Sequence, residues 1–234
     1  FHTLAKQYKT LAEKLQLLIK NNEELSSLKR NSEIRLLEAQ FNPHFILNAL
    51  ESLRYSLHLD IDASHEIITA LSNQLKYSLY NFQEDTRLKD DLSYVDGYIR
   101  LHEIRFDSKI IYKREIDPGL LDAVVPKLVI QPLVENSIKY GFRYQDKLTI
   151  TIKAYKDGEN LFISVTDDGH GLKEDEYQEV MDMLQSDIPP DHHIGLYSIN
   201  RRIALLYGDG YRIEIVNKEG ESFSVIIKLP LIVN

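Results

Sequence analysis

The residues best suited to chemistry in this sequence lie in three short stretches of its second half. In the first, Asp167 follows an apolar, β-branched run, and Gly169 and Gly171 come after it at alternate positions. Glycines let the backbone turn sharply and approach a ligand, while a carboxylate at a strand end can accept a hydrogen bond from the amino group of a base. An ordinary Asp-Gly β-turn explains the same residues. This stretch alone leaves both alternatives open.

The second stretch is a predicted helix over 131–141, in which Asn136 and Lys139 stand one turn apart. Asparagine is unfavourable in the middle of a helix, and its amide oxygen is a hard ligand suited to magnesium. Lys139 also lies four residues after Glu135, so a solvated ion pair along the helix is the simpler explanation for this lysine. No comparable structural reason accounts for Asn136.

In the third stretch, Gly195 and Leu196 open a helix after the proline-bearing and acidic loop 186–193. A helix N-terminus offers free amide groups and the positive end of a dipole to phosphates. A plain surface loop is the alternative.

These stretches depend on the elements that hold them. Beyond residue 106, alternation and β-branched content predict strands at 110–116, 148–155, 161–166, 211–216 and 223–229. Helical segments are predicted between them, at 126–140, 173–184 and 196–206. The pattern indicates an α+β domain.

The first half of the chain is predicted to be helical, with helices at 32–40, 45–59, 63–80 and 88–105. Pro43 interrupts this pattern, and a proline removes a helix hydrogen bond and redirects the rod. The residue that follows the break is His44. Pro43 is therefore expected to expose or redirect this histidine.

A heptad pattern occupies the first 31 residues and predicts a parallel coiled coil; one amphipathic helix packed on its own domain is the alternative. Its seam positions are Leu4, Tyr8, Leu11, Leu15, Leu18, Asn22 and Leu25. An asparagine at such a position fixes register at a cost in stability. The predicted domains are therefore 1–31 as a coiled coil, 32–106 as a helical domain and 107–234 as the α+β domain.

Composition excludes several classes of protein. The 234 residues hold 36 Asp and Glu against 28 Lys and Arg, a net charge of −8, and no basic patch is visible. Binding to nucleic acid is therefore not expected. The absence of cysteine excludes disulfides, thiolate nucleophiles and Cys-ligated zinc. The sequence has no run of about 20 apolar residues that could span a bilayer. It begins at Phe1 and continues directly into a predicted helix, so we expect a piece of a longer chain.

The order of the three stretches resembles the nucleotide-binding domain shared by histidine kinases, DNA gyrase and related ATPases. Residues 37–50, LEAQFNPHFILNAL, closely resemble the phosphoacceptor box of the LytS/YesM-type sensor histidine kinases. The similarity continues through 71–79, 98–99 and 103–106, and covers about residues 33–232.

The resemblance implies a helical dimerisation and phosphoacceptor domain followed by a two-layer α/β sandwich of the Bergerat type, which binds ATP and Mg²⁺. It makes His44 the phosphorylated residue. Asn48, one turn further on, is a candidate to orient the imidazole, and Glu51 or Glu38 are alternatives for assisting it.

In the nucleotide site, the resemblance makes Asn136 the magnesium ligand and Asp167 the contact to the adenine amino group. Lys139 is expected near the phosphates. The positions of close approach and the helix start are Gly169, Gly171, Gly195 and Leu196.

The implied partners are a second copy of the chain, in a homodimer, and the receiver domain of a response regulator. The implied location is the cytoplasmic portion of a cell-membrane protein, which reaches the membrane only through a missing N-terminal segment. The sequence departs from the family at His193, where glycine is usual, and at Ser198, where asparagine is usual. These departures motivate an alternative, a dimeric nucleotide-binding scaffold without kinase activity. An ATPase that hydrolyses rather than transfers is a third, which the His44 box disfavours.

Overall fold

A computed structural model of the chain describes residues 68–69, 72, 85–105, 109–186, 188, 190 and 194–233. The predicted coiled coil of 1–31, the helices at 32–40 and 45–59, and both His44 and Asn48 lie outside these residues. Of the predicted helix at 63–80, residues 68, 69 and 72 are described, and they are helical. No helix within the described ranges is both long enough and apolar enough to cross a membrane.

A five-stranded mixed sheet forms the centre of the described region, in the order β2-β4-β5-β7-β6. Strands β2 and β4 run parallel, and the other neighbours are antiparallel. The strand bounds are β2 Ile110–Ile116, β4 Leu148–Asp157, β5 Asn160–Asp167, β6 Ile213–Lys218 and β7 Ser222–Pro230. All five predicted strands are present, and β2 has the predicted bounds.

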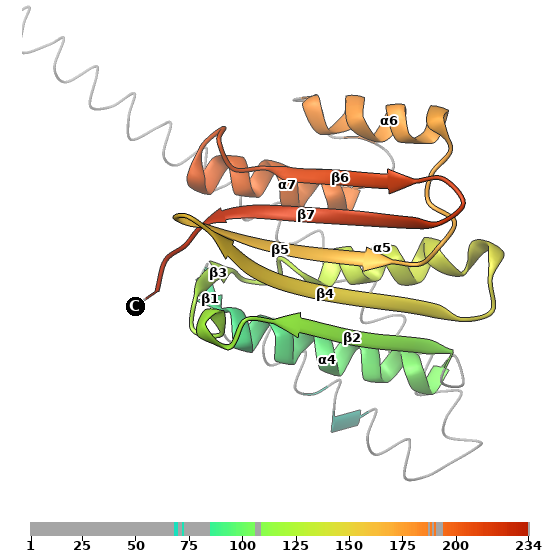
Figure 1. Cartoon of the computed structure of the whole chain (residues 1–234), viewed down its shortest axis with the longest axis horizontal. Helices are drawn as coiled ribbons and strands as arrows, with labels where there is room; N and C mark the ends of the chain where they lie inside the picture. The colour runs from blue at the N-terminus through green and yellow to red at the C-terminus, as the bar shows by residue number, and fades with distance from the viewer. Residues whose placement is uncertain are drawn as a thin grey trace, which may run out of the picture. The chain divides into compact units, whose positions relative to one another are not determined.

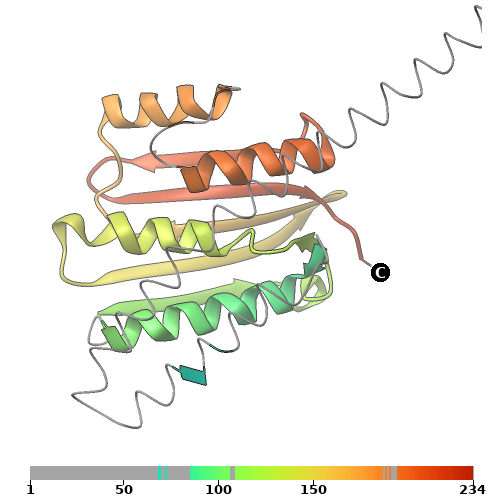
Figure 2. The same ribbon diagram turned by 180° about the vertical axis from the view of Figure 1, so that it is seen from behind.

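Helices cover one face of this sheet. Helices α4, α5 and α7 lie behind it in Figure 1 and in front of it in the opposite view of Figure 2. Their bounds are α4 Leu88–Arg105, α5 Gln131–Gly141 and α7 Ile194–Tyr207, and α6, Glu174–Gln185, contacts α7. The predicted two-layer α/β arrangement is confirmed, and α4 has the predicted bounds.

The core lies between these two layers. Alternate residues of β4 point inward, so Ile150 and Ile152 are fully buried, and β5 continues the same face with Ile163. Helix α4 contributes Leu88 and Leu92 to the same buried cluster. The helix that leads out of the predicted phosphoacceptor region therefore packs directly against the α+β layer.

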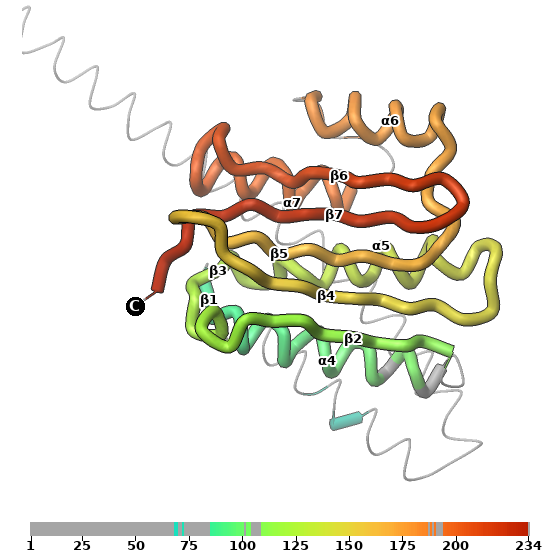
Figure 3. The backbone as a smooth tube through the Cα atoms, viewed as in Figure 1, coloured from blue at the N-terminus to red at the C-terminus, as the bar shows by residue number. Residues whose placement is uncertain are grey.

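A small second sheet lies beside the start of α4. Strand β1, Asp85–Arg87, pairs with β3, Val124–Pro126, in antiparallel register. The described part of the chain also has two 3-10 turns, η1 Pro118–Leu120 and η2 Phe142–Tyr144. The C-terminal segment runs past β3, and Val124 donates its amide hydrogen to the carbonyl of Ile232 at 2.8 Å (Figure 3).

The prediction of a helix over 126–140 is wrong at its start. Pro126 ends strand β3, and the helix begins at Gln131. Between them, Leu128 has a φ of 59°, a left-handed conformation that a leucine rarely adopts and that ends any regular helix. The apolar run 128–130 gave no local sign of this turn, whose amides donate hydrogen bonds to a carboxylate of α4.

Candidate functional site

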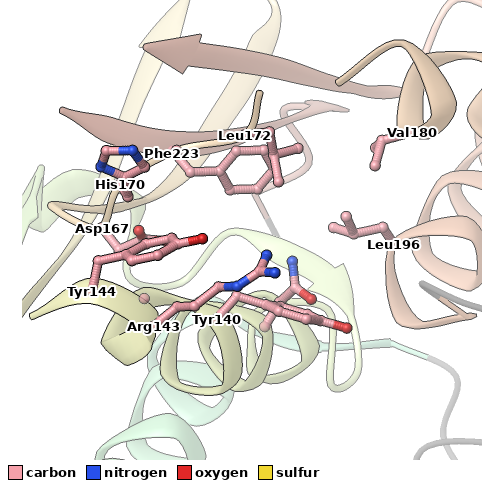
Figure 4. Close-up of a pocket in the computed structure, with 12 residues that line it drawn as sticks. Tyr140, Arg143, Tyr144, Asp167, His170, Leu172, Val180, Leu196 and Phe223 are labelled. Carbon is pink, nitrogen blue, oxygen red and sulfur yellow. The ribbon is translucent and has the colours of Figure 1, made fainter. Parts of the chain in front are cut away.

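A single pocket brings the predicted stretches together. It is a hollow of about 550 Å³, counted with the open solvent at its mouth. Figure 4 shows Leu172 and Phe223 on one side, Tyr140 and Arg143 on the other, and Val180 and Leu196 from the helices beyond. The remaining lining residues are Asn136, Gly141, Tyr144, Asp167, His170 and Gly171.

Asp167 ends strand β5 and lies in this pocket with only 4% of its surface exposed. The Ser137 hydroxyl donates to its Oδ2 at 2.7 Å, and the Gly169 amide donates to its Oδ1 at 3.1 Å. Burial raises the pKa of Asp167 to about 6, against these two hydrogen bonds, which lower it. A carboxylate held in two directions at a pocket wall has a fixed orientation toward a ligand.

The turn after Asp167 is shaped by contacts within the protein. A Cβ on Gly169 would lie 2.7 Å from Asp167 Oδ1 and 3.0 Å from the Cα of Gly141 in α5. Gly171 has a φ of 68°, and a Cβ there would meet the Lys218 carbonyl oxygen at 2.6 Å. Both glycines are therefore required to bring this turn against its neighbours, and Gly171 also lines the pocket.

The side chain of Asn217, on β6, holds the end of the same turn. Its Oδ1 accepts from the Leu172 amide at 2.7 Å, and its Nδ2 donates to the Leu172 carbonyl at 2.8 Å. This pairing imitates one rung of a β-ladder, and it fixes Leu172 at the pocket wall. Sequence reasoning missed Asn217, since nothing in its local pattern pointed to a residue 45 positions away.

Helix α5 presents Asn136 to the pocket, where it is half-buried. The buried Ser137 beside it contacts Asp167, so one helical turn serves both groups. Lys139 is exposed, does not line the pocket, and holds its Nζ 5.0 Å from the centre of the Tyr140 ring. Because Tyr140 lines the pocket, Lys139 stands next to its rim.

Of the two residues predicted in the third stretch, one lines the pocket and the other does not. Leu196, 2% exposed, lines the pocket from the start of α7. Gly195 does not line it, and a Cβ there would make an ordinary contact of 3.7 Å with Pro132 Cβ. Nothing within the described protein therefore requires a glycine at 195.

Five polar or aromatic lining residues escaped sequence reasoning: Tyr140, Arg143, Tyr144, His170 and Phe223. The rings of Tyr144 and His170 lie 4.8 Å apart, and Arg143 pairs with Glu176 of α6 at 3.2 Å. His170 lies inside the glycine turn, a position that could have flagged it. Tyr140 lies in the last turn of α5, where the amphipathic pattern of a helix explains it equally well, and Arg143 and Tyr144 lie in the 3-10 turn η2 that follows.

Asn136 is the sequence-predicted magnesium ligand, and the donor set fits such a role. No group of three or more His, Cys, Asp or Glu side chains suited to a metal occurs among the described residues. Magnesium is commonly held by one or two protein oxygens together with substrate phosphates and water. An amide oxygen on a pocket wall suits that shared mode of binding, and not a site made by protein alone.

Two family models match the chain in series. Residues 32–110 match the histidine kinase model, and residues 122–232 match the model of the histidine kinase-, DNA gyrase B- and HSP90-like ATPases. The chain belongs to the histidine kinase family. The pocket lies in the ATPase-type part, which supports ATP as its substrate.

Curated relatives agree with this family. The sensor protein kinase HptS of Staphylococcus aureus strain USA300 is 30% identical over 221 residues, which are 94% of this chain and 42% of HptS. HptS from strain NCTC 8325 / PS 47 matches equally. This histidine kinase chain thus spans less than half the length of the curated relatives it matches.

Solved structures share the fold. The catalytic domain of histidine kinase ThkA has a TM-score of 0.50 at 18% identity, covering 64% of this chain and 97% of that domain. A bacterial phosphotransferase has a TM-score of 0.51 at 14% identity, covering 85% of this chain and 96% of that structure. At these identities the likeness concerns the fold alone.

Proposed function

We propose that this histidine kinase chain transfers the γ-phosphoryl group of ATP to His44 and passes it to an aspartate on a response regulator. The observation that carries the proposal is Asp167, a carboxylate buried in a pocket that Asn136 also lines. Burying a charge is costly, so a carboxylate with a raised pKa in a pocket is a candidate for a functional group, and a fixed acceptor at a pocket wall suits the amino group of adenine.

The charges around the pocket support one orientation of the nucleotide. Among the described lining residues, Arg143 alone carries a permanent positive charge, and Lys139 stands at the rim beside Tyr140. Phosphates are expected toward these cations and Asn136, with the base against Asp167. Gly171 and Leu196 also line the pocket, Gly169 allows the turn after Asp167 to pack closely, and Gly195 lies at the start of α7.

In the transfer itself, a nitrogen of the His44 imidazole attacks the γ-phosphorus, the bond to the bridging oxygen breaks, and ADP leaves with that electron pair. Asn48 would orient the ring, and a carboxylate, either Glu51 or Glu38, would assist by accepting the imidazole proton. Asn136 would hold magnesium, which when bound offsets charge on the phosphates. The protein contributes mainly position and electrostatics in such transfers.

The proposed division of the chain is a signalling coiled coil at 1–31, a dimerising phosphoacceptor domain at 32–106 and an ATP-binding domain at 107–234. The proposed protein is a homodimer that acts on a receiver domain. The described part would be the cytoplasmic portion of a cell-membrane protein, and no nucleic acid partner is proposed.

A dimeric scaffold that binds nucleotide without transferring phosphate is the second candidate, motivated by His193 and Ser198. His193 lies outside the described residues. Ser198 is fully buried in α7 and is not among the residues that line the pocket. The change at 198 therefore weighs less against catalysis than the sequence alone suggested.

Incubation with γ-labelled ATP and magnesium separates these functions. We expect acid-labile, base-stable label on the chain, and loss of that label in His44→Gln. Label retained by His44→Gln at the wild-type rate would contradict the assignment. Free phosphate without labelled protein would indicate an ATPase, and nucleotide binding without either product would indicate the scaffold.

A further inference from the structure

A buried carboxylate outside the pocket contacts the turn that precedes α5. Asp91 lies in the first turn of α4 and is fully buried, while its neighbour Asp90 is exposed. Its Oδ1 accepts from the Leu128 amide at 2.6 Å, and its Oδ2 accepts from the Ile130 amide at 3.2 Å. An acidic residue in a first turn usually needs no more explanation than its own helix dipole. Asp91 instead bonds a segment 37 to 39 residues away.

The segment that Asp91 holds is unusual in two respects. Leu128 has the left-handed φ of 59°, which costs a leucine of order 1–3 kcal/mol and persists only when its surroundings impose it. Ile130 is the N-cap of α5, and no side chain of its own caps that helix. The carboxylate of Asp91 supplies what the local sequence lacks, since it fixes the turn and binds the amide of the cap residue.

Helix α7 holds the same turn from another side. Arg202 is 3% exposed, and its Nη1 donates to the Lys127 carbonyl at 2.6 Å. Burial raises the pKa of Asp91 to about 6, and the charge of Arg202 acts against this effect by favouring the ionised form. One buried cluster therefore joins α4, the turn before α5, and α7. Helix α5, which follows this turn, lines the pocket through Asn136, and α7 lines it through Leu196.

We infer that Asp91 is a positioning residue for the nucleotide site: it fixes the turn at 128–130, and through it the placement of α5 and Asn136. Helix α4 lies within the region matched by the histidine kinase model, and α5 lies within the region matched by the ATPase model. The contact thus connects the phosphoacceptor region with the pocket. This inference rests on the proposed function, because it concerns the binding of ATP.

The test replaces Asp91 with Asn, which keeps the shape, removes the charge and turns one acceptor into a donor facing backbone amides. Asp90→Asn, an exposed carboxylate one position earlier, is the matched control. We expect Asp91→Asn to weaken ATP binding in calorimetry about tenfold or more, as loss of a buried charged hydrogen bond implies. Asp90→Asn should bind as the wild type does.

A second substitution separates positioning from general loss of stability. Leu128→Gly permits the left-handed turn without strain but removes a half-buried side chain. In the Asp91→Asn background it should restore several-fold of the lost ATP affinity, although by itself it lowers thermal stability. No recovery would mean that Asp91 acts only on stability, and would overturn the inference.

If circular dichroism shows that Asp91→Asn does not fold, Asp91→Glu replaces it, keeping the charge and displacing the carboxylate by one methylene. A folded variant of either kind that binds ATP within twofold of wild type would overturn the inference and leave the proposed function intact. Failure of the wild-type chain to bind ATP would instead overturn the proposed function.

Discussion

At the scale of single residues, Asp167 is placed where it can serve the site but lowers the stability of the fold at neutral pH. Two donors, the Ser137 hydroxyl and the Gly169 amide, are not enough to offset burial, and the pKa of Asp167 rises to about 6. At neutral pH the fold therefore carries an ionised group that would be more favourable in water. Such a cost is common where a side chain is retained for function.

Asp167→Asn should weaken nucleotide binding. The substitution exchanges an acceptor-only carboxylate for an amide, and a lost charge-assisted hydrogen bond is worth about 1.5–3 kcal/mol, which is about tenfold or more in affinity. Calorimetric titration with ATP measures the change. Equal affinity for the two proteins would remove Asp167 from the site.

The same variant should gain stability relative to the wild type as the pH rises, because the wild type loses stability in that range. When the pKa of a carboxyl is higher in the folded than in the unfolded protein, the carboxyl stabilises the fold at any pH below the unfolded-state pKa. This contribution is lost as the pH rises from the unfolded-state pKa through the folded-state pKa. For Asp167 the window runs from 3.8 to about 6. Asn does not titrate, so Asp167→Asn should gain roughly 3 kcal/mol relative to wild type between pH 4 and 7, at about 1.4 kcal/mol per unit. Urea unfolding at several pH values measures this, and parallel curves for both proteins would contradict it.

At the scale of elements, the sequence predicted what local pattern determines. Helix α4 has its predicted bounds because buried apolar residues recur along it at helical spacing, at Leu88, Leu92, Val95 and Ile99. Strand β2 also has its predicted bounds. The predicted start of α5 was wrong because Asp91, in a distant part of the chain, fixes the turn at Leu128. The short strands β1 and β3 were missed for a different reason, because a strand of three residues is too short to show an alternating sequence pattern.

The turn with Gly169 and Gly171 was predicted as a candidate ligand contact. In the structure, both glycines are needed first for packing within the protein. Gly171→Ala should destabilise the protein by about 1–3 kcal/mol, because it adds a Cβ at a positive φ against the carbonyl of Lys218. Gly210→Ala is the control, since a Cβ there meets nothing within 4 Å. Chemical denaturation measures both, and equal stability of the two variants would show that the β6–β7 turn gives way easily.

At the scale of the whole molecule, the order of the motifs predicted more than any one of them. Asp167, Asn136 and Leu196 come from separate elements, and the two-layer fold brings them to one pocket. The lining by Tyr144 and Phe223 could not be predicted, because it depends on how η2 and β7 meet the pocket in space. The site residues that bear most on transfer, His44 and Asn48, lie in the part of the chain outside the described residues and remain predictions.

The dimer is the last prediction, and it rests on the heptad seam of residues 1–31, which also lies outside the described residues. If two copies pair in parallel, each Asn22 meets its symmetry mate only when the helices are in register. Asn22→Leu should therefore raise thermal stability, and should blunt any response to an upstream signal that acts by shifting register, because such a shift needs two states within a few kcal/mol. Sedimentation at micromolar concentration measures the dimer, and thermal unfolding compares the variant. A monomer would contradict the dimer, whereas a dimer that Asn22→Leu destabilises would place Asn22 outside the seam.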